Sequence, residues 1–463
     1  MGSKKLKAIV VKGSKKVKCA HGEKFRQLVK EVHRLITKSP ALAEFSKFGS
    51  SETVEVTAEL GILPAKNWAA TSIFAPVETL GGEAHIKYTV TRVGCYGCTV
   101  RCGQVRLVKN GPLAGFLSEG PEFETIYSLG TMVGVDYPPA VIAGDRLCDE
   151  FGLDTISTGV VIAFAMECLE KGIISRKNLD GLDLKFGDYE AMLKMIRKIA
   201  YREGIGDILA EGVKRASEIL GKGSERYALH VKGLELPGYD VRGAKAHGLN
   251  YATAYTGADH NRGYAIQEIF DVPIPYRVDR LAVEGKGKLC MWNQDVRTAA
   301  CDSMPFCSFI FTRAFKDRAL QFMSKLYGSL TGLSMTPEDV QKAGERINNI
   351  ARAFNVREGF TRTDDYLPSR VMDEAIPDGA SKGQRISRLE LDRMLDEYYE
   401  ARGWDKTGIP LRTKLVELGL SEIAKDLYHI NHNINHPHKT SKQKETSNEK
   451  LRKEKPKTKT QNT

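Results

Sequence analysis

The stretch GCYGCTVRC, residues 94–102, places three cysteines close together at Cys95, Cys98 and Cys102. Thiolates are soft ligands, and cysteines at this spacing are typical of iron–sulfur clusters. Gly97, inside the stretch, would let the backbone fold closely around such a cluster. A zinc knuckle or ordinary buried thiols would also account for the spacing, so the three cysteines alone leave these alternatives open.

A four-iron cluster requires a fourth thiolate, which must come from elsewhere in the chain. The downstream candidates are Cys290, Cys301 and Cys307. Cys148 and Cys168 lie within helical patterns, where a cysteine more often belongs to the core. The spacing of the residues does not choose among the three downstream cysteines.

The length and composition are those of an ordinary soluble protein, with 463 residues, 41% of them hydrophobic and 27% charged. This length favours two domains. No apolar run approaches the roughly 20 residues that cross a membrane, and no targeting segment opens the chain. Reduced, clustered cysteines also indicate the cytoplasm.

The net charge of +11 owes much to the basic tail at residues 439–463, which holds nine Lys or Arg against three Glu. A basic surface can attract an acidic protein partner. No nucleic-acid-binding module is recognisable, so we expect no nucleic acid partner.

The hydrophobic pattern predicts a mainly α fold with two largely helical domains. Gly and Pro concentrate at residues 233–263, which indicates a domain boundary near residue 230. The division is therefore a β-like opening at 1–18, helical domains at 19–229 and 230–428, and a disordered basic tail at 429–463. Strands are expected at 6–11 and 86–93, and helices at 22–37, 154–171, 189–203, 206–220, 313–330, 336–354 and 385–402.

Two acidic turns stand out further along the chain. In DEFGLDT, residues 149–155, Asp154 is placed to cap the helix that follows. A second turn, DSMPFC, sets Asp302 five positions before Cys307. Each turn alone is best explained as local structure, but two such turns could flank one bound ligand.

A histidine and a group of carboxylates are candidates for proton transfer. His260, in GADHNRG at residues 257–263, has a side chain whose ordinary pKa lies near neutrality, although a lone histidine is usually structural. Glu122 and Glu124, in the stretch 118–125, could supply a general base. The alternative is a helix start, where acidic residues are favoured by the exposed amides.

Taken in order, these stretches resemble the tungsten-dependent aldehyde:ferredoxin oxidoreductase family. The resemblance extends from residue 1 to about residue 420. It rests on MGSKKLKAIVVKG, GCYGCTVRC, EGPEFET, DEFGLDTISTG, ELPGYDVRGAKAHGLNYATAYTGADH, EGKGKLCMWNQD, FNVREGF and ARGWDKTGIP.

The resemblance implies a 4Fe-4S cluster beside tungsten, or molybdenum, held between two pyranopterins. Cys95, Cys98 and Cys102 are similar to the first three cluster ligands, and Cys307 to the fourth. The implied pterin-binding residues are Asp149, Leu153, Asp154, Arg262 and Asp302.

The implied catalytic residues are Glu124, with Glu122 as its competitor, and His260. The implied reaction is the oxidation of a small aldehyde to a carboxylate. Glu124 would deprotonate or orient water, and His260 would hydrogen-bond the aldehyde oxygen. Electrons would pass through the cluster to ferredoxin, and the resemblance is compatible with a homo-oligomer.

In the family, MGSKKLKAIVVKG closes an N-terminal β-rich domain that supports the pterins, whereas here it opens the chain. We therefore expect a separate chain to supply that domain, with a misplaced start or a remnant as alternatives. Two other functions also stay open: reduction of aromatic thioesters by the same fold, and electron transfer by a fragment that holds only the cluster.

Overall fold

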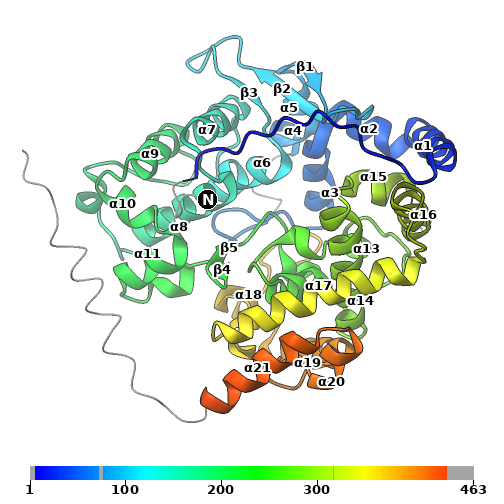
Figure 1. Ribbon diagram of the computed structural model, residues 1–463. Helices are drawn as coiled ribbons and strands as arrows, with labels where there is room; N and C mark the ends of the chain where they lie inside the picture. Colours follow the sequence, from blue (N-terminus) through cyan, green and yellow to red (C-terminus); the bar gives the residue numbers. More distant parts are fainter. Residues whose placement is uncertain (1–5, 72–76, 316–317, 435–463) are drawn as a thin grey trace, which may run out of the picture.

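The computed structural model describes residues 6–71, 77–315 and 318–434, which form a mainly helical protein (Figure 1). The helices are α1 (Gly22–Thr37), α2 (Pro40–Phe48), α3 (Thr53–Glu59), α4 (Val77–Leu80), α5 (Gly82–Ile86), α6 (Phe123–Leu129), α7 (Pro138–Phe151), α8 (Thr155–Glu170), α9 (Tyr189–Tyr201), α10 (Ile205–Leu209), α11 (Gly212–Leu220), α12 (Lys245–Thr253), α13 (Ile266–Ile269), α14 (Lys286–Val296), α15 (Ser308–Ile310), α16 (Ala319–Thr331), α17 (Pro337–Arg357), α18 (Ser369–Asp373), α19 (Arg388–Arg402), α20 (Arg412–Glu417) and α21 (Ser421–Ile434). The strands are β1 (Thr89–Val93), β2 (Gly103–Leu107), β3 (Leu117–Glu119), β4 (His230–Val231) and β5 (Leu234–Glu235).

The three cysteines of residues 94–102 lie in the connection between two paired strands. β1 and β2 run antiparallel, with Val93 opposite Gly103, and β3 pairs with the other edge of β2. The cysteine-containing connection therefore projects from one end of a small antiparallel sheet.

Several helices begin where the sequence carries a capping residue. The Asp154 side chain accepts a hydrogen bond from the Ser157 amide at the start of α8. Thr336 and Asp339 form a capping box at the start of α17. These caps satisfy amides that would otherwise lack partners, and they confirm the predicted starts of both helices.

Several predicted elements differ from the structure. The predicted strand at 86–93 begins only at Thr89, because α5 continues to Ile86, and the predicted helix at 313–330 corresponds to a π-helix at Phe311–Phe315 and to α16 from Ala319. The predicted helix at 206–220 is broken into α10 and α11 at Gly212, whose φ of 80° lies in the left-handed region. The predicted strand at 6–11 pairs with no other strand among the described residues, and its side chains are exposed. A strand requires a hydrogen-bonding partner, so the expected N-terminal β element is an extended segment instead.

The predicted tail at 429–463 is helical at its start, because α21 continues to Ile434. The rest of the predicted tail lies outside the described residues. Within the part of the chain that the structure describes, no single helix is long and apolar enough to cross a membrane. Among the same described residues, α7 and α8 are the one pair of helices that passes this test when taken together, and they are bent by 115° at their junction.

A cluster of buried side chains holds the cysteine connection against later helices. Val100 belongs to this cluster with Phe45 of α2, Val296 of α14 and Phe322 of α16. In Figure 1, α1 lies beside α16 on the same side of the molecule. Packing between segments far apart in the sequence therefore brings residues 94–102 near residues 296–326.

The largest cluster of buried side chains includes residues on both sides of the predicted domain boundary. Its members range from Val54 through Phe164 to Tyr398 and Trp404. The division near residue 230 stays a prediction.

Candidate functional site

The cysteine connection has a backbone shape that presents its thiols at the surface. Gly97 and Arg101 both have positive φ, of 71° and 53°. The Cys98 amide donates a hydrogen bond to the Cys95 carbonyl, at 3.0 Å. Cys95 is exposed, whereas Cys98 and Cys102 are half-buried. A tight turn of this kind leaves the sulfur atoms free to bind a ligand.

Cys307 approaches this connection from a distant segment. It lies directly before α15 and is exposed. Burial raises the pKa of Cys102 to about 12, and the nearby Glu122, Cys307 and Cys98 add to the effect in that order. The structure thus brings Cys98, Cys102 and Cys307 within electrostatic reach of one another.

The other two downstream cysteines have different surroundings. The Cys290 thiol is buried and lies 3.6 Å from the Thr253 hydroxyl. Burial raises the pKa of Cys290 to about 12. Cys301 is half-buried near Cys307. Of the downstream cysteines, only Cys307 is exposed like Cys95, and its assignment as the fourth ligand stays a prediction.

Among the described residues, no group of three or more His, Cys, Asp or Glu side chains is arranged to hold one metal ion. The thiolates of a four-iron cluster bind different iron atoms, so they surround a space larger than a single ion. The soft sulfur donors and the open turn fit a cluster.

The two acidic turns differ in their contacts. Asp149 lies at the exposed end of α7, and Leu153 follows Gly152, whose φ is 68°. Asp154 caps α8 and lies near enough to Glu124 to raise its pKa. The first predicted turn is therefore close to the predicted base.

The second turn is tied to the segment that carries His260. Arg262 donates a hydrogen bond to Asp302 at 2.7 Å, and it also contacts Asp259 at 3.1 Å and the Tyr255 hydroxyl at 2.8 Å. Arg262 is thus already engaged by two carboxylates. A pterin phosphate would have to share or replace these contacts.

Glu124 and His260 face each other. Glu124 Oε1 lies 3.6 Å from His260 Nε2 and has no hydrogen-bonding partner among the described residues. Its Oε2 accepts a hydrogen bond from the Gly238 amide at 2.7 Å. The competitor, Glu122, is exposed and accepts a hydrogen bond from Ser50 instead.

Burial shifts the pKa values of these two groups in opposite directions. It raises the pKa of Glu124 to about 8, against the hydrogen bond from Gly238. It lowers the pKa of His260 to about 4, against the nearby charge of Asp259 and with help from Arg297 and Arg262. Desolvation disfavours the charged form of each group, so both side chains are largely neutral at pH 7.

A cavity of about 1020 Å³ extends from Cys102 to this pair. Cys102, Glu124 and His260 all line it. Most of the remaining wall is aromatic or aliphatic, which is typical of a site that binds an organic ligand. The aromatic residues of the wall are Phe45, Phe123, Tyr239, Tyr264, Phe270 and Phe309.

Sequence reasoning missed several of the residues around this cavity. Arg297 lies on its wall, and its Nε is buried without a hydrogen-bonding partner among the described residues. Asn261 and Tyr264 also line it. Asn261 and Tyr264 could have been suspected because they neighbour His260, whereas nothing in the local pattern around Arg297 indicates a site.

Residues 27–420 match the family model described as aldehyde ferredoxin oxidoreductase, domains 2 and 3. The chain is 40% identical over 428 residues to the tungsten-containing aldehyde ferredoxin oxidoreductase of Pyrococcus furiosus, covering 91% of this chain and 68% of that protein. The tungsten-containing aldehyde ferredoxin oxidoreductase of Thermococcus kodakarensis is 39% identical over 428 residues, covering 91% of this chain and 68% of that protein. An aliphatic sulfonate oxidoreductase, WOR-like subunit of Pyrococcus furiosus is 29% identical, over 94% of this chain and 67% of its own.

A solved structure has the same fold. It is the active-site complex BamBC of benzoyl coenzyme A reductase with 1,5-dienoyl-CoA. The TM-score is 0.74 at 23% identity, over 94% of this chain and 70% of that one.

Proposed function

Because the chain belongs to the aldehyde ferredoxin oxidoreductase family, we propose that it oxidises aldehydes to carboxylates and passes the electrons to ferredoxin. The observation that carries the proposal is the shared cavity. Cys102 lines it together with Glu124, whose buried Oε1 lies 3.6 Å from His260 Nε2 and has no hydrogen-bonding partner among the described residues. A redox group and an acid–base pair that share one cavity would suit an oxidation that also moves protons.

Glu124 is the proposed base. Its raised pKa, about 8, lies close to the pH at which the protein would work. A base of this strength removes a proton effectively in the molecules in which it is ionised, and that fraction grows as pH rises towards 8. Since Oε2 is held by Gly238, the partnerless Oε1 is the oxygen that would take a proton from water or hold that water in place.

His260 is the proposed hydrogen-bond donor to the aldehyde oxygen. A neutral imidazole can donate one hydrogen bond without bringing a full charge into an apolar cavity. Such a donor stabilises the negative charge that develops on a carbonyl oxygen when water attacks it. The aromatic wall around His260 would pack against the organic part of the substrate.

The proposed cofactors are a tungsten or molybdenum bis-pyranopterin and a 4Fe-4S cluster. When bound, they accept the two electrons of the oxidation and release them one at a time. Cys95, Cys98, Cys102 and Cys307 would hold the cluster. Asp149, Leu153, Asp154, Arg262 and Asp302 would hold the pterins.

The exposed edge of the cysteine connection is the proposed exit for electrons. Cys95 is exposed at that edge, and the neighbouring Tyr96 is fully accessible. A ferredoxin that docks there would approach the cluster closely. The matched family model covers domains 2 and 3, so we propose that a domain 1, on this or another polypeptide, completes the pterin site.

The test is anaerobic dye reduction with a panel of aldehydes, using protein loaded with metal and produced together with a domain 1. Aldehyde-dependent reduction is expected for the wild type. Glu124→Gln should lower kcat by about 10²-fold or more, because a positioned base contributes that much. Glu122→Gln is the matched control, since it removes a carboxyl group two residues away that does not face His260.

Two outcomes would redirect the proposal. Turnover of aromatic thioesters but not aldehydes would indicate a reductase on the same fold. Iron and sulfide without turnover of either class, in fully loaded protein, would indicate an electron-transfer role. Equal losses in the Glu122 and Glu124 variants would contradict the assignment of the base.

A further inference from the structure

The side-chain amide of Asn261 lies between His260 and Arg297. Arg297 donates a hydrogen bond from Nη2 to the Asn261 side-chain oxygen. The Asn261 side-chain nitrogen lies 2.9 Å from His260 Nε2. A guanidinium group can only donate hydrogen bonds, so it fixes which end of the amide faces Arg297 and which faces His260.

This orientation determines the protonation of the imidazole. An amide nitrogen only donates, so His260 Nε2 must accept and cannot itself carry a proton. The burial of His260 keeps the ring neutral at pH 7. The hydrogen-bond network therefore assigns the single ring proton to Nδ1.

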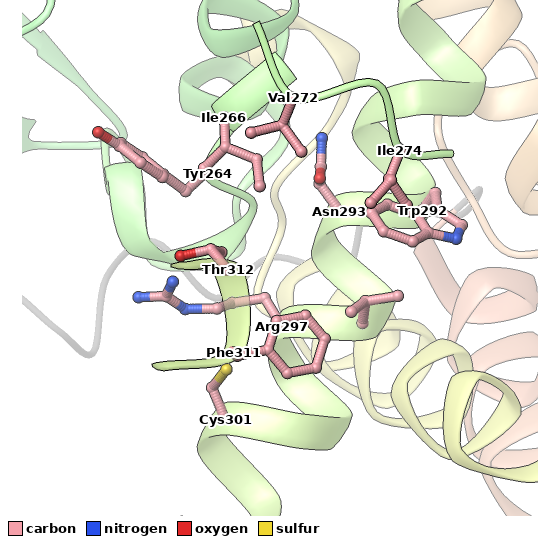
Figure 2. Close-up of a pocket in the computed structure, with 11 residues that line it drawn as sticks. Tyr264, Ile266, Val272, Ile274, Trp292, Asn293, Arg297, Cys301, Phe311 and Thr312 are labelled. Atoms are coloured by element: carbon pink, nitrogen blue, oxygen red, sulfur yellow. The ribbon is translucent and has the colours of Figure 1, made fainter. Parts of the chain in front are cut away.

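His260 Nδ1 has no hydrogen-bonding partner among the described residues. Because the ring lines the cavity, Nδ1 is the nitrogen left to donate to a bound molecule. Arg297 reaches Asn261 from α14's end, and Figure 2 shows its guanidinium extending away from Trp292 and towards Thr312.

The turn that carries His260 and Asn261 is held by several hydrogen bonds. Asp259 accepts hydrogen bonds from the Asn261 amide at 2.8 Å and from Arg262 Nε at 3.1 Å. The Asp259 carbonyl accepts a hydrogen bond from Asn250 at 3.0 Å. The backbone of Asn261 thus has little freedom to carry its amide away from His260.

We propose that Asn261, oriented by Arg297, is a positioning residue that fixes His260 as its Nδ1–H tautomer and so makes Nδ1 the donor to the substrate oxygen. The catalytic consequence rests on the proposed function, whereas the tautomer does not. Losing the Asn261 contact would leave the ring proton free to move to Nε2, the nitrogen that lies 3.6 Å from Glu124 Oε1.

Other groups around His260 do not supply an alternative explanation. Among the described residues, no group other than Asn261 is a hydrogen-bonding partner of either ring nitrogen, and Glu124 Oε1, 3.6 Å from Nε2, is beyond a direct hydrogen bond. The titratable and charged groups that face His260 are Glu124, Asp259, Arg262, Arg297, His247, Tyr239 and Tyr264.

The direct test is nuclear magnetic resonance of full-length protein labelled with ¹⁵N-histidine, with His260→Gln used to assign the signals. At pH 7 we expect the chemical shift of a protonated nitrogen for Nδ1 and of an unprotonated nitrogen for Nε2. Asn261→Asp should move the proton to Nε2, because a carboxylate only accepts. The new negative charge should also raise the pKa of His260 by about 1 to 3 units.

Asn349→Asp is the matched control. Asn349 is a buried asparagine whose side-chain oxygen accepts a hydrogen bond from Trp404 and whose nitrogen donates to the Glu345 carbonyl. This substitution should leave the His260 signals unchanged. A wild-type protein with the proton on Nε2 would overturn the proposal even if no variant folds, and so would an unchanged tautomer in Asn261→Asp.

A kinetic measurement tests the catalytic consequence separately from the tautomer. In protein that oxidises aldehydes, Asn261→Asp should lower kcat by about 10²- to 10³-fold, as expected for the loss of one donor to a developing negative charge, and should change KM much less. Absence of aldehyde turnover in the wild type would count against the proposed function alone, because the tautomer is measured without substrate.

Discussion

Glu124→Gln should make the stability of the protein less sensitive to pH. The ordinary pKa of this carboxyl is 4.5, and in the folded chain it is raised to about 8, chiefly by burial. The folded state therefore holds a proton that the unfolded chain releases. Stability is lost as pH rises from about 4.5 to about 8 and changes little from this source at higher pH.

The magnitude follows from the same two values. They differ by about 3.5 pH units, and each unit is equivalent to about 1.4 kcal/mol, so the full effect is about 5 kcal/mol. Between pH 5 and pH 9 about 4 kcal/mol of it would appear. Glutamine keeps an oxygen for the Gly238 amide and cannot ionise, so Glu124→Gln should be progressively more stable than the wild type as pH rises.

The assay is urea unfolding of both proteins at pH 5, 7 and 9. Subtracting the variant's free energy of unfolding from that of the wild type removes contributions from other titrating groups. Glu122→Gln is the control, because substitutions of exposed residues usually change stability by about 0.5 kcal/mol or less. A wild-type-minus-variant difference that stays constant within about 1 kcal/mol from pH 5 to 9 would refute the raised pKa.

Three further predictions test other parts of the structure. Cys307→Ala should remove iron and acid-labile sulfide from the purified protein, whereas Cys290→Ala should not; equal loss in both would contradict the ligand assignment. Arg402→Leu should lower the free energy of unfolding by about 3 to 5 kcal/mol, because it leaves the buried Asp295 without its ion-pair partner; a loss below about 1 kcal/mol in urea unfolding would show that the pair contributes little. Thr336→Ala should lower the free energy of unfolding by about 1 kcal/mol, because it removes the cap of α17. An unchanged free energy in urea unfolding would contradict a stabilising role of this cap.

Local signals in the sequence predicted helices well where caps were present. Asp154 and Thr336 both cap the helices expected after them. Elements that depend on a distant partner were predicted less well. The stretch at 6–11 has strand-like residues but no pairing strand among the described residues, and Gly212 breaks a helix that periodicity alone would continue.

In the candidate site, too, local features were predicted from the sequence and contacts between distant segments were not. The spacing of Cys95, Cys98 and Cys102 is local, so the sequence revealed it directly. The approach of Cys307 depends on the packing of α1, α2 and α16 around Val100, which no local pattern encodes. Arg297 was missed for this reason too, since it meets Asn261 only in the folded chain.

The proposed function requires that this chain holds an iron–sulfur cluster beside a metal–pterin site and uses both on aldehydes. The most direct measurement is elemental and sulfide analysis of anaerobically purified protein, produced alone and together with a domain 1 of the family. We expect four irons with sulfide per chain, with tungsten or molybdenum retained when domain 1 is present. Zinc alone, or iron without tungsten or molybdenum in both samples, would contradict it.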